Sequence, residues 1–402
     1  RDAFRMLMRY QREDGKTEHE IPQSLPFQPD FFQTSMYAYI HTDGPVYFLA
    51  AYGEYYRQTG DLALIREHWP NIRRGLKWCF SQVDPEDGLI RIEPGSWGSS
   101  ESSFTIRKDT NLEAVWIKAL KEMAGLAEVM EEEDLADRCR TAAARAAESL
   151  EKTFWNEKRS FYLWGIDREG RPVSDLVPYL AVGIWFDSFQ KDRAAKALEQ
   201  MAGSDFRSDW GVRSHSLSNP GYDPAAYQTG SAWPVWNAGV IIGDYRRHQA
   251  VEGFRNWMSM VRLRQLDGLG PMPEVLHGHV YKRLKEGVPH QMFAETALVN
   301  GFYEGLLGLE IDVPENTVHL SPALPPAWNE LEIKRNPFGD NSFDVSLHKT
   351  QKSLQIEIDP GNNTDTRFIL SPSLPAGSRV TAVTADGLRF PCEVETHPSA
   401  TV

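Results

Sequence analysis

The spacing of apolar residues changes near residue 310 of this 402-residue chain, and the change divides the sequence into two regions. Before that point apolar positions recur every three or four residues, as they do over residues 112–130, which is typical of an amphipathic helix. After it apolar and polar residues alternate, as they do over residues 354–358, which is typical of half-buried strands. The sequence therefore predicts a mainly α-helical domain over residues 1–312 and a small antiparallel β-sandwich over residues 313–402.

Helix-forming segments follow one another in pairs through the first region, about ten in all. The clearest cover residues 46–59, 62–82, 112–130, 135–154, 177–189, 193–202, 232–245, 248–263 and 293–307. The long connections, residues 14–34, 87–109, 204–227 and 267–293, are rich in Trp, Gly, Pro and acidic residues. No repeat of fixed length occurs, which argues against a solenoid. The alternation of short and long connections favours a closed toroid of helix hairpins, with the long loops forming a binding rim.

The charge balance and the cysteine content exclude several classes of protein. Lys and Arg total 43 against 56 Asp and Glu, so the net charge of −13 repels phosphate backbones and no nucleic-acid partner is expected. No apolar stretch approaches the roughly 18 residues of a membrane span, so no membrane partner is expected. Three widely separated cysteines, Cys79, Cys139 and Cys392, cannot form a disulfide framework. The compartment, cytoplasmic or periplasmic, and the oligomeric state stay open.

The motifs of several cofactor-dependent and nucleophilic enzyme classes are missing. The sequence has no Gly-x-Ser-x-Gly stretch and no Gly-x-x-x-x-Gly-Lys-Ser/Thr phosphate loop. The pair Gly268 and Gly270 lacks the third glycine of a dinucleotide site. The pair His277 and His279 lacks a third metal ligand at a recognisable spacing. No cofactor and no metal ion are therefore expected.

Acidic and aromatic residues gather in the long loops, and the chain as a whole has 12 Trp, 14 Tyr and 19 Phe. Cleavage of a glycosidic bond needs that combination. One protonated acid assists the leaving oxygen, a second carboxylate acts as base or nucleophile, and aromatic rings hold the sugar. The loop carboxylates that fit these roles are Glu93, Glu101, Asp109, Asp209, Asp223, Glu274 and Glu286.

Four stretches, taken in their order along the chain, are similar to one enzyme family. They are residues 12–21 with 39–43, residues 87–90 with Trp97 and 111–120, the Tyr-Gln-Thr-Gly-Ser-Ala-Trp-Pro run of residues 227–234, and residues 273–275 with 289–295. The chain resembles the helical toroid glycosidases, specifically the amylo-α-1,6-glucosidase region of glycogen debranching enzymes and their glucoamylase-like relatives. The resemblance covers about the first three quarters of the chain.

The resemblance implies an (α/α)6 toroid of twelve helices, followed by a small C-terminal β-sandwich. The count of about ten predicted helices falls short of that number. Either N-terminal helices are missing from residues 1–312 or a helix has been overlooked. The chain also begins with Arg1 rather than Met, which adds to the expectation that an upstream segment has been removed.

The same resemblance implies an inverting glycoside hydrolase that acts on an α-glucoside or oligosaccharide without a cofactor. Glu274 corresponds to the base that activates water, and Glu101 is the candidate acid that protonates the leaving oxygen. In an inverting site the two carboxyl groups lie about 6.5–9.5 Å apart. The expected substrate-binding residues are Asp43, Trp97, Asp109, Tyr227, Trp233, His290 and Gln291. Trp97 has little apolar sequence around it and is expected in an exposed cleft.

Two positions depart from the family pattern. Ser99 stands where the family has an aspartic acid shortly after the tryptophan, and Asn111 stands where it has a glutamic acid before a helix. Serine cannot donate a proton at neutral pH as a carboxylic acid with a raised pKa does. Three explanations stay open. The acid has moved to Glu101 or else to Asp109, the protein takes another aglycone, or activity has been lost.

Three other functions fit parts of this sequence. A disaccharide phosphorylase would use phosphate in place of water, and Lys282, Arg283 and Lys285 lie near the expected base. A catalytically silent carbohydrate-binding protein would explain Ser99. A helical scaffold for protein partners would need an exposed apolar face, and the aromatic and acidic loops argue against it.

Overall fold

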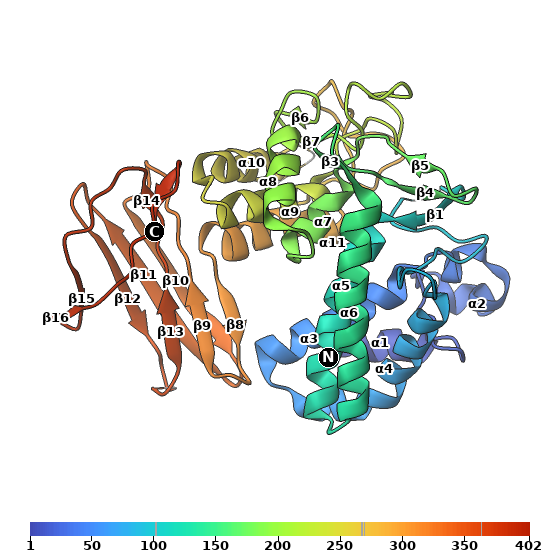
Figure 1. Ribbon diagram of the computed structural model, residues 1–402, viewed down its shortest axis with the longest axis horizontal. Helices are drawn as coiled ribbons and strands as arrows, with labels where there is room; N and C mark the ends of the chain where they lie inside the picture. The colour runs from blue at the N-terminus through green and yellow to red at the C-terminus, as the bar shows by residue number, and fades with distance from the viewer. Residues whose placement is uncertain (101–102, 267, 269, 363) are drawn as a thin grey trace.

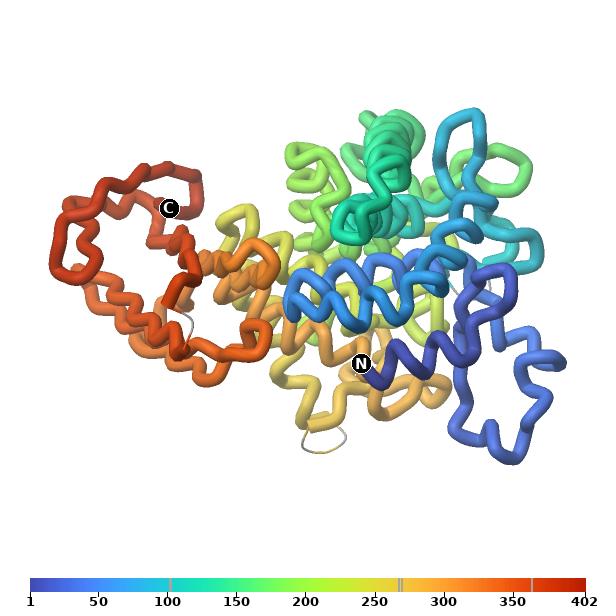
Figure 2. Tube along the Cα trace, turned by 90° about the horizontal axis from the view of Figure 1, so that it is seen from below, coloured from blue at the N-terminus to red at the C-terminus, as the bar shows by residue number. Residues whose placement is uncertain are grey.

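The structure, a computed structural model, describes residues 1–402 except residues 101, 102, 267, 269 and 363. A helical region and a β region lie side by side (Figure 1). The N-terminus belongs to the helical region and the C-terminus to the β region. The perpendicular view also keeps the orange and red trace of the β region beside the helices rather than among them (Figure 2).

The described α-helices agree with most of the predicted segments. They are α1 (Asp2–Tyr10), α2 (Phe31–Thr34), α3 (Gly44–Thr59), α4 (Leu62–Gln82), α5 (Thr110–Val129), α6 (Glu133–Phe154), α7 (Ala181–Trp185), α8 (Lys191–Met201), α9 (Pro234–Arg246), α10 (Ala250–Leu263) and α11 (Met292–Asn300). A π-helical turn, Gly301–Leu306, continues α11. Helices α1 and α2 were not predicted.

The prediction of a single helix over residues 177–189 is wrong. A 3-10 turn, Pro178–Leu180, leads into the short helix α7, which ends at Trp185. Asp187 has a φ of 50°, which takes the backbone out of the right-handed helical region. The apolar spacing continues past this point because Phe189 is buried against the core, but the helix itself ends at Trp185.

Alternate helices along the chain form a series in which each packs against the following member. Helix α3 packs against α5, α5 against α7, α7 against α9, and α9 against α11, while α4, α6 and α10 cover α3, α5 and α9. Successive helices joined as hairpins run antiparallel, so alternate helices run in the same direction. We therefore infer that the N-termini of α3, α5, α9 and α11 lie toward one end of the helical region, which we call the rim.

Helices α5 and α9 form the centre of this region. Both have buried residues on all sides, which is typical of a helix inside a large domain. Trp116 of α5 is fully buried. The turn between α3 and α4 is fixed by its sequence, since Gly60 ends α3 at a φ of 67° and the Asp61 side chain accepts a hydrogen bond from the Leu64 N–H at 3.2 Å.

Short strands interrupt the helical region. Strands β1 (Ile106–Asp109), β4 (Gly165–Asp167) and β5 (Pro172–Val173) form an antiparallel sheet, β2 (Trp155–Asn156) pairs with β3 (Phe161–Tyr162), and β6 (Arg207–Ser208) pairs with β7 (Gly211–Val212). The prediction that this region holds only helices and loops is therefore wrong. Strands as short as these show too few alternations to be recognised in a sequence.

The β region contains two three-stranded sheets with a shared apolar core that includes Val318, Phe343 and Phe368. One sheet joins β10 (Glu330–Phe338), β11 (Asn341–Lys349) and β12 (Leu354–Asp359), and the other joins β8 (Glu310–Asp312), β9 (Thr317–Leu320) and β13 (Arg367–Leu370). Two smaller pairs follow, β14 (Leu374–Pro375) with β17 (Ala400–Thr401) and β15 (Val383–Ala385) with β16 (Leu388–Phe390).

The prediction of an antiparallel β-domain is wrong at one pair of strands. Strand β13 runs parallel to β9, with Phe368 opposite Val318. Alternation along a strand indicates which face is buried, but it does not indicate which neighbour the strand pairs with. Strand β8 begins at Glu310, within the range assigned to the helical domain, and pairs with β9.

Candidate functional site

Four of the residues predicted to bind substrate occupy equivalent positions in the fold. Asp43 is the N-cap residue of α3, Asp109 of α5, Trp233 of α9 and Gln291 of α11. Because these helices run in the same direction, the four residues lie toward the same rim. The free N–H groups and the positive dipole ends of helix N-termini suit an oxygen-rich ligand.

Asp109 is held rigidly at the start of α5. Its Oδ1 accepts hydrogen bonds from the Leu112 N–H and the Ser99 hydroxyl, both at 2.7 Å, and its Oδ2 accepts one from the Ser99 N–H at 2.8 Å. Burial raises the pKa of this carboxyl group, and the charge of Asp43 adds to the rise. To carry a proton toward a substrate, Asp109 would have to give up one of these bonds.

Ser99 and Asn111, the two positions that depart from the family pattern, belong to the hydrogen-bond network of Asp109. The Ser99 hydroxyl, which donates to Asp109, accepts a hydrogen bond from Asn111 Nδ2 at 2.8 Å. Asn111 Nδ2 also donates to the Tyr47 hydroxyl at 3.2 Å. Burial raises the pKa of Tyr47, so its hydroxyl stays protonated. Ser99, Asn111 and Asp109 thus form one hydrogen-bonded unit that reaches α3.

Trp97 lies against the loop that leads into α3. Its N–H donates to the Ile40 carbonyl and its carbonyl accepts from the Thr42 N–H, both at 2.9 Å. The expectation of an exposed Trp97 is wrong, because the residue is only 6% exposed. Its ring packs between Tyr37 and Phe104, which come from other parts of the loops and which the sequence pattern did not connect with it.

His41 connects Trp97 with Asp43. The His41 ring packs edge-on against Trp97, with 5.4 Å between ring centres, and its Nδ1 lies 3.0 Å from Asp43 Oδ1. His19 stacks on His41 at 4.2 Å between ring centres. Although Asp43 occupies the N-cap position of α3, its side chain makes no capping hydrogen bond. Its carboxylate is therefore bound by His41 and not by the helix.

Tyr227 and Trp233 lie together at the start of α9. Their rings meet edge-on at 4.8 Å, and the Tyr227 carbonyl accepts hydrogen bonds from Trp233 Nε1 at 2.9 Å and the Ser231 hydroxyl at 2.5 Å. Both pack with Val275 and Leu284 in a small apolar cluster. Trp233 is buried, so it forms a wall of the rim and not an exposed platform.

Glu274 lies on a segment that pairs with the start of α9. Ala232 and Leu276 exchange two backbone hydrogen bonds of 2.8 Å. The Glu274 side chain is buried, and its Oε1 accepts from Gln291 Nε2 at 3.1 Å while its Oε2 accepts from the Val288 N–H at 3.0 Å. Each carboxylate oxygen can accept a second hydrogen bond, which leaves positions for a water molecule.

His290 is directed to a different partner. Its Nε2 lies 2.8 Å from Glu295 Oε1, and the pair lies at the surface of α11. The structure therefore brings Gln291 to Glu274 but pairs His290 with a carboxylate that was not among the expected site residues.

A side-chain hydrogen bond joins the loop of the Asp109 unit to the loop that precedes α9. The Ser100 hydroxyl donates to Gln228 Oε1 at 3.4 Å. Ser100 directly follows Ser99 of the Asp109 unit, and Gln228 directly follows Tyr227 of the cluster beside Glu274. The loops that precede α5 and α9 therefore meet.

Glu101, the expected acid, lies outside the described residues. Among the other loop carboxylates, Asp209 and Glu286 are exposed. Asp223 closes a turn by accepting a hydrogen bond from the Ala225 N–H at 2.9 Å. These three carboxylates lack the burial that raises the pKa of a general acid.

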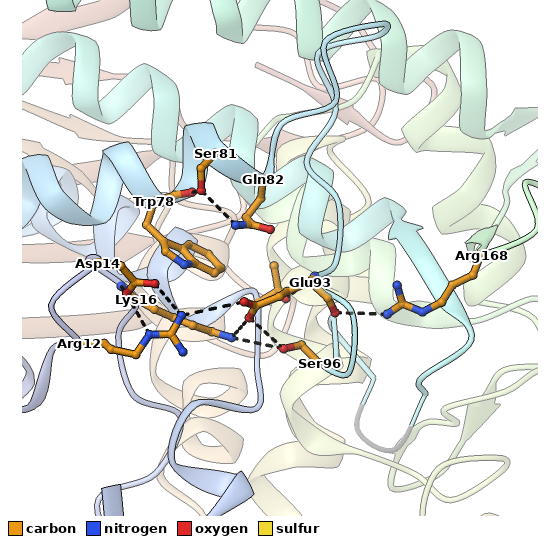
Figure 3. Close-up of polar contacts among 10 residues, drawn as sticks. Arg12, Asp14, Lys16, Trp78, Ser81, Gln82, Glu93, Ser96 and Arg168 are labelled. Atoms are coloured by element: carbon orange, nitrogen blue, oxygen red, sulfur yellow. Dashed lines mark hydrogen bonds and ion pairs between the residues drawn. The ribbon is translucent and has the colours of Figure 1, made fainter. Parts of the chain in front are cut away.

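An ion pair that the sequence did not predict holds the loop before Trp97. Lys16 Nζ donates to Glu93 Oε2 at 2.6 Å and to the Ser96 hydroxyl at 3.3 Å (Figure 3). Lys16 is only 1% exposed, and its Nζ lies 5.2 Å from the centre of the Trp78 ring. Burial lowers the pKa of Lys16, and the bond to Glu93 opposes that fall.

Two arginines complete the surroundings of Glu93. Arg12 Nη2 lies 3.9 Å from Glu93 Oε1 and 2.7 Å from Asp14 Oδ2. Arg168 Nη2 donates to the Glu93 carbonyl at 3.3 Å, from the opposite side of the loop (Figure 3). Residues 12–16 and 93–97 are thereby fastened to each other next to the rim.

Glu18 is a buried carboxylate whose two oxygens have no hydrogen-bond partner among the described residues. Burial raises its pKa from 4.5 to about 7. Between these two values the folded state holds a proton that the unfolded chain has released. The free energy of unfolding therefore falls as the pH rises through this window, and the loss is complete above about pH 7.

Replacing Glu18 with Gln is expected to stabilise the protein increasingly as the pH rises. The gain should grow by about 2 kcal/mol between pH 5 and pH 8, because the amide avoids the buried charge. Urea unfolding at the two pH values measures it, with Glu20→Gln at the exposed neighbour as the matched control. An equal gain at both pH values would show that Glu18 is already ionised at pH 5.

Within the described part of the chain, His, Cys, Asp and Glu side chains do not gather in groups of three or more that could hold a metal ion. None of the described helices combines the length and the hydropathy that crossing a membrane requires. The cysteines are free thiols, of which Cys79 and Cys139 are buried and Cys392 is exposed.

Part of the chain matches a known family. Residues 107–277 match the model of the family described as mannosylglycerate hydrolase MGH1-like glycoside hydrolase domain. This range contains Asp109, Trp233 and Glu274. A solabiose phosphorylase from Paenibacillus borealis is 23% identical over 405 residues, a match that covers 89% of this chain and 50% of that protein. The chain thus spans about half the length of this curated relative.

Solved structures share the fold at low sequence identity. An α-L-rhamnosidase from Dictyoglumus thermophilum superposes with a TM-score of 0.64 at 11% identity, over 99% of this chain and 41% of that chain. A GH63 mannosylglycerate hydrolase from Thermus thermophilus, solved in complex with glucose, gives a TM-score of 0.56 at 17% identity, over 74% of this chain and 86% of that chain. Residues 107–277 are therefore similar to a glycoside hydrolase domain, and the chain shares the helical fold of these solved structures.

Proposed function

We propose that this chain hydrolyses the glycosidic bond of an α-glycoside with inversion of configuration. Glu274 removes a proton from the water that attacks the anomeric carbon. The observation that carries the proposal is the setting of Glu274, a buried carboxylate with one hydrogen bond to each oxygen and acceptor positions left for water. The adjoining wall of Tyr227 and Trp233 supports a sugar as the ligand.

In this proposal Glu101 protonates the departing oxygen. It lies two residues after Ser99, on the loop that Asp109 anchors. Asp109 is the second candidate, because burial raises its pKa, although its three hydrogen bonds suit a helix cap better. Asp43, Gln291 and Trp233 surround the sugar in the innermost subsite.

Three sugars are candidates for the substrate. The resemblance to the debranching enzymes favours an α-glucoside. The family description and the rhamnosidase structure name mannosyl and rhamnosyl substrates for their own members. A substrate panel has to include all three sugars.

A disaccharide phosphorylase is the second candidate, and one observation favours it besides the solabiose phosphorylase match. Arg283 lies on a segment that pairs with the segment of Glu274, since Leu276 and Arg283 form a β-bridge and the Leu284 N–H donates to the Val275 carbonyl at 3.2 Å. A phosphate ion in place of the attacking water would need such a basic residue nearby.

The experiment that tests the proposal follows α-glucosides, α-mannosides and α-rhamnosides by proton NMR, with and without inorganic phosphate. Hydrolysis is expected to proceed without phosphate and to release the sugar first as the β-anomer. Turnover that depends on phosphate and yields a glycosyl phosphate would establish the phosphorylase instead. Binding without turnover in either buffer would contradict both and favour a silent carbohydrate-binding protein.

A further inference from the structure

Three aromatic rings form a row beside Asp43, and we call Tyr37, Trp97 and Phe104 the aromatic shelf. Tyr37 and Phe104 each pack against Trp97, with 5.9 and 5.7 Å between ring centres. Trp97 is buried, whereas Tyr37 is 48% exposed and Phe104 is 43% exposed. The two outer rings therefore offer apolar surface to the solvent from a buried support. Exposed apolar surface gathered in this way marks a binding site more often than single exposed side chains do.

The shelf is held in place by its backbone. Tyr37 lies in a 3-10 turn, Met36–Tyr39, and its N–H donates to the Ser35 hydroxyl at 3.3 Å. The Phe104 carbonyl accepts a hydrogen bond from Arg168 Nε at 2.7 Å. Trp97 is paired with the strand-like residues 40–42. Rings fixed in this way lose little conformational entropy when a ligand binds.

Polar groups lie next to these rings. His41 packs against Trp97 and holds the Asp43 carboxylate. The indole N–H of Trp97 is buried and, among the described residues, has no hydrogen-bond partner. A buried donor without a partner is unfavourable, and a hydroxyl group of a ligand would satisfy it. An apolar ring face beside a donor and a carboxylate matches a pyranose, which has an apolar C–H face and a hydroxyl edge.

The position of the shelf in the chain indicates which part of a substrate it meets. Trp97 and Phe104 belong to the loop between α4 and α5, in which Ser99 donates a hydrogen bond to Asp109, the second candidate for the acid. A general acid stands beside the leaving oxygen, so groups on its own loop face the leaving group. Glu274, the proposed base, comes instead from the segment before α11 and is joined to the start of α9.

We infer that the aromatic shelf binds the leaving-group ring of the substrate. The inference rests on the proposed function and narrows its substrate class to glycosides whose aglycone is itself a ring, such as a second sugar. A glycoside with a small aliphatic aglycone would leave the shelf empty.

Calorimetric titration with matched pairs of glycosides tests this inference. The 4-nitrophenyl and methyl α-glycosides of glucose, mannose and rhamnose share a sugar and differ in the aglycone ring, and the Glu274→Gln protein binds them without turnover. For the sugar that binds, we expect Tyr37→Ala and Phe104→Ala each to weaken the nitrophenyl glycoside about fivefold to tenfold and the methyl glycoside less than about twofold. Tyr37→Phe should keep the affinity, and Phe27→Ala, at a residue 87% exposed, is the matched control.

Several outcomes overturn the inference. The inference fails if an alanine variant loses affinity equally for both members of a pair, or if neither alanine variant loses affinity. It also fails if the Glu274→Gln protein without further substitutions binds none of the pairs. Circular dichroism and the melting temperature check that the variants are folded, and rescue by Tyr37→Phe separates a ring contact from a folding defect. Normal turnover by Glu274→Gln with the ring preference retained would overturn the base assignment alone. Loss of the ring preference with the Glu274 effect intact would overturn the shelf alone.

Discussion

Replacing Glu274 with Gln is expected to lower kcat about a thousandfold and to change KM less than about threefold. The amide keeps the volume of the side chain. Its oxygen can accept from the Val288 N–H, and its NH2 can donate to Gln291 once the Gln291 amide turns over, but it cannot take a proton from water. The interaction that is lost exists mainly in the transition state, so the effect falls on kcat. Initial rates on the best glycoside of the panel measure it.

A matched control separates this role from a general effect of removing a loop carboxylate. Glu286→Gln, at an exposed carboxylate of the same loop, should leave both kcat and KM unchanged. A loss of less than about tenfold in Glu274→Gln would remove Glu274 from the base role.

The sequence allowed the long helices to be predicted, since each has enough turns for its spacing to be recognised. Helix α4 has the predicted bounds, and its N-cap Asp61 marks its start. What the sequence concealed is short or non-local. The strands β1 to β7 span too few residues to show alternation, and the parallel pairing of β13 with β9 depends on residues about fifty positions apart. The break after Trp185 depends on one left-handed residue, Asp187, that no motif announces.

The same distinction holds for the candidate site. The family resemblance pointed to Asp43, Asp109, Trp233 and Gln291, and in the structure each of them directly precedes a helix. Contacts between loops were not recognisable. In the aromatic shelf, Tyr37 and Phe104 pack against Trp97 from other parts of the loops. Nothing in the sequence around Lys16 indicates that this loop lysine is buried. The feature that drew attention to Lys16 was its place beside Gly15 in residues 12–21, one of the stretches that resemble the glycosidase family.

Removing the carboxylate of Glu93 is expected to destabilise the protein strongly. In Glu93→Gln the ammonium group of Lys16, 1% exposed, keeps only the Ser96 hydroxyl, the Trp78 ring and an amide oxygen. Breaking one side of a buried ion pair costs about 3 kcal/mol. Urea unfolding measures the loss. The loss should shrink at alkaline pH, because burial lowers the pKa of Lys16 and the unfavourable charge disappears when the amine is deprotonated.

The opposite substitution should be milder, and the difference tests the physical account. In Lys16→Met the thioether fills the buried space, and Glu93, whose side chain is 31% exposed, stays hydrated and close to Arg12. We expect the free energy of unfolding to fall by about 1 kcal/mol. The double variant should be about as stable as Lys16→Met, because Glu93→Gln does no harm once the buried ammonium group is gone, and the coupling energy between the two positions is then large. Asp14→Asn, at the exposed ion pair with Arg12, is the control and should cost less than about 1 kcal/mol. Equal losses for Lys16→Met and Glu93→Gln that simply add in the double variant would mean that the burial of Lys16 does not govern this loop, and that residues 93–97 are held by the backbone bonds of Trp97 instead.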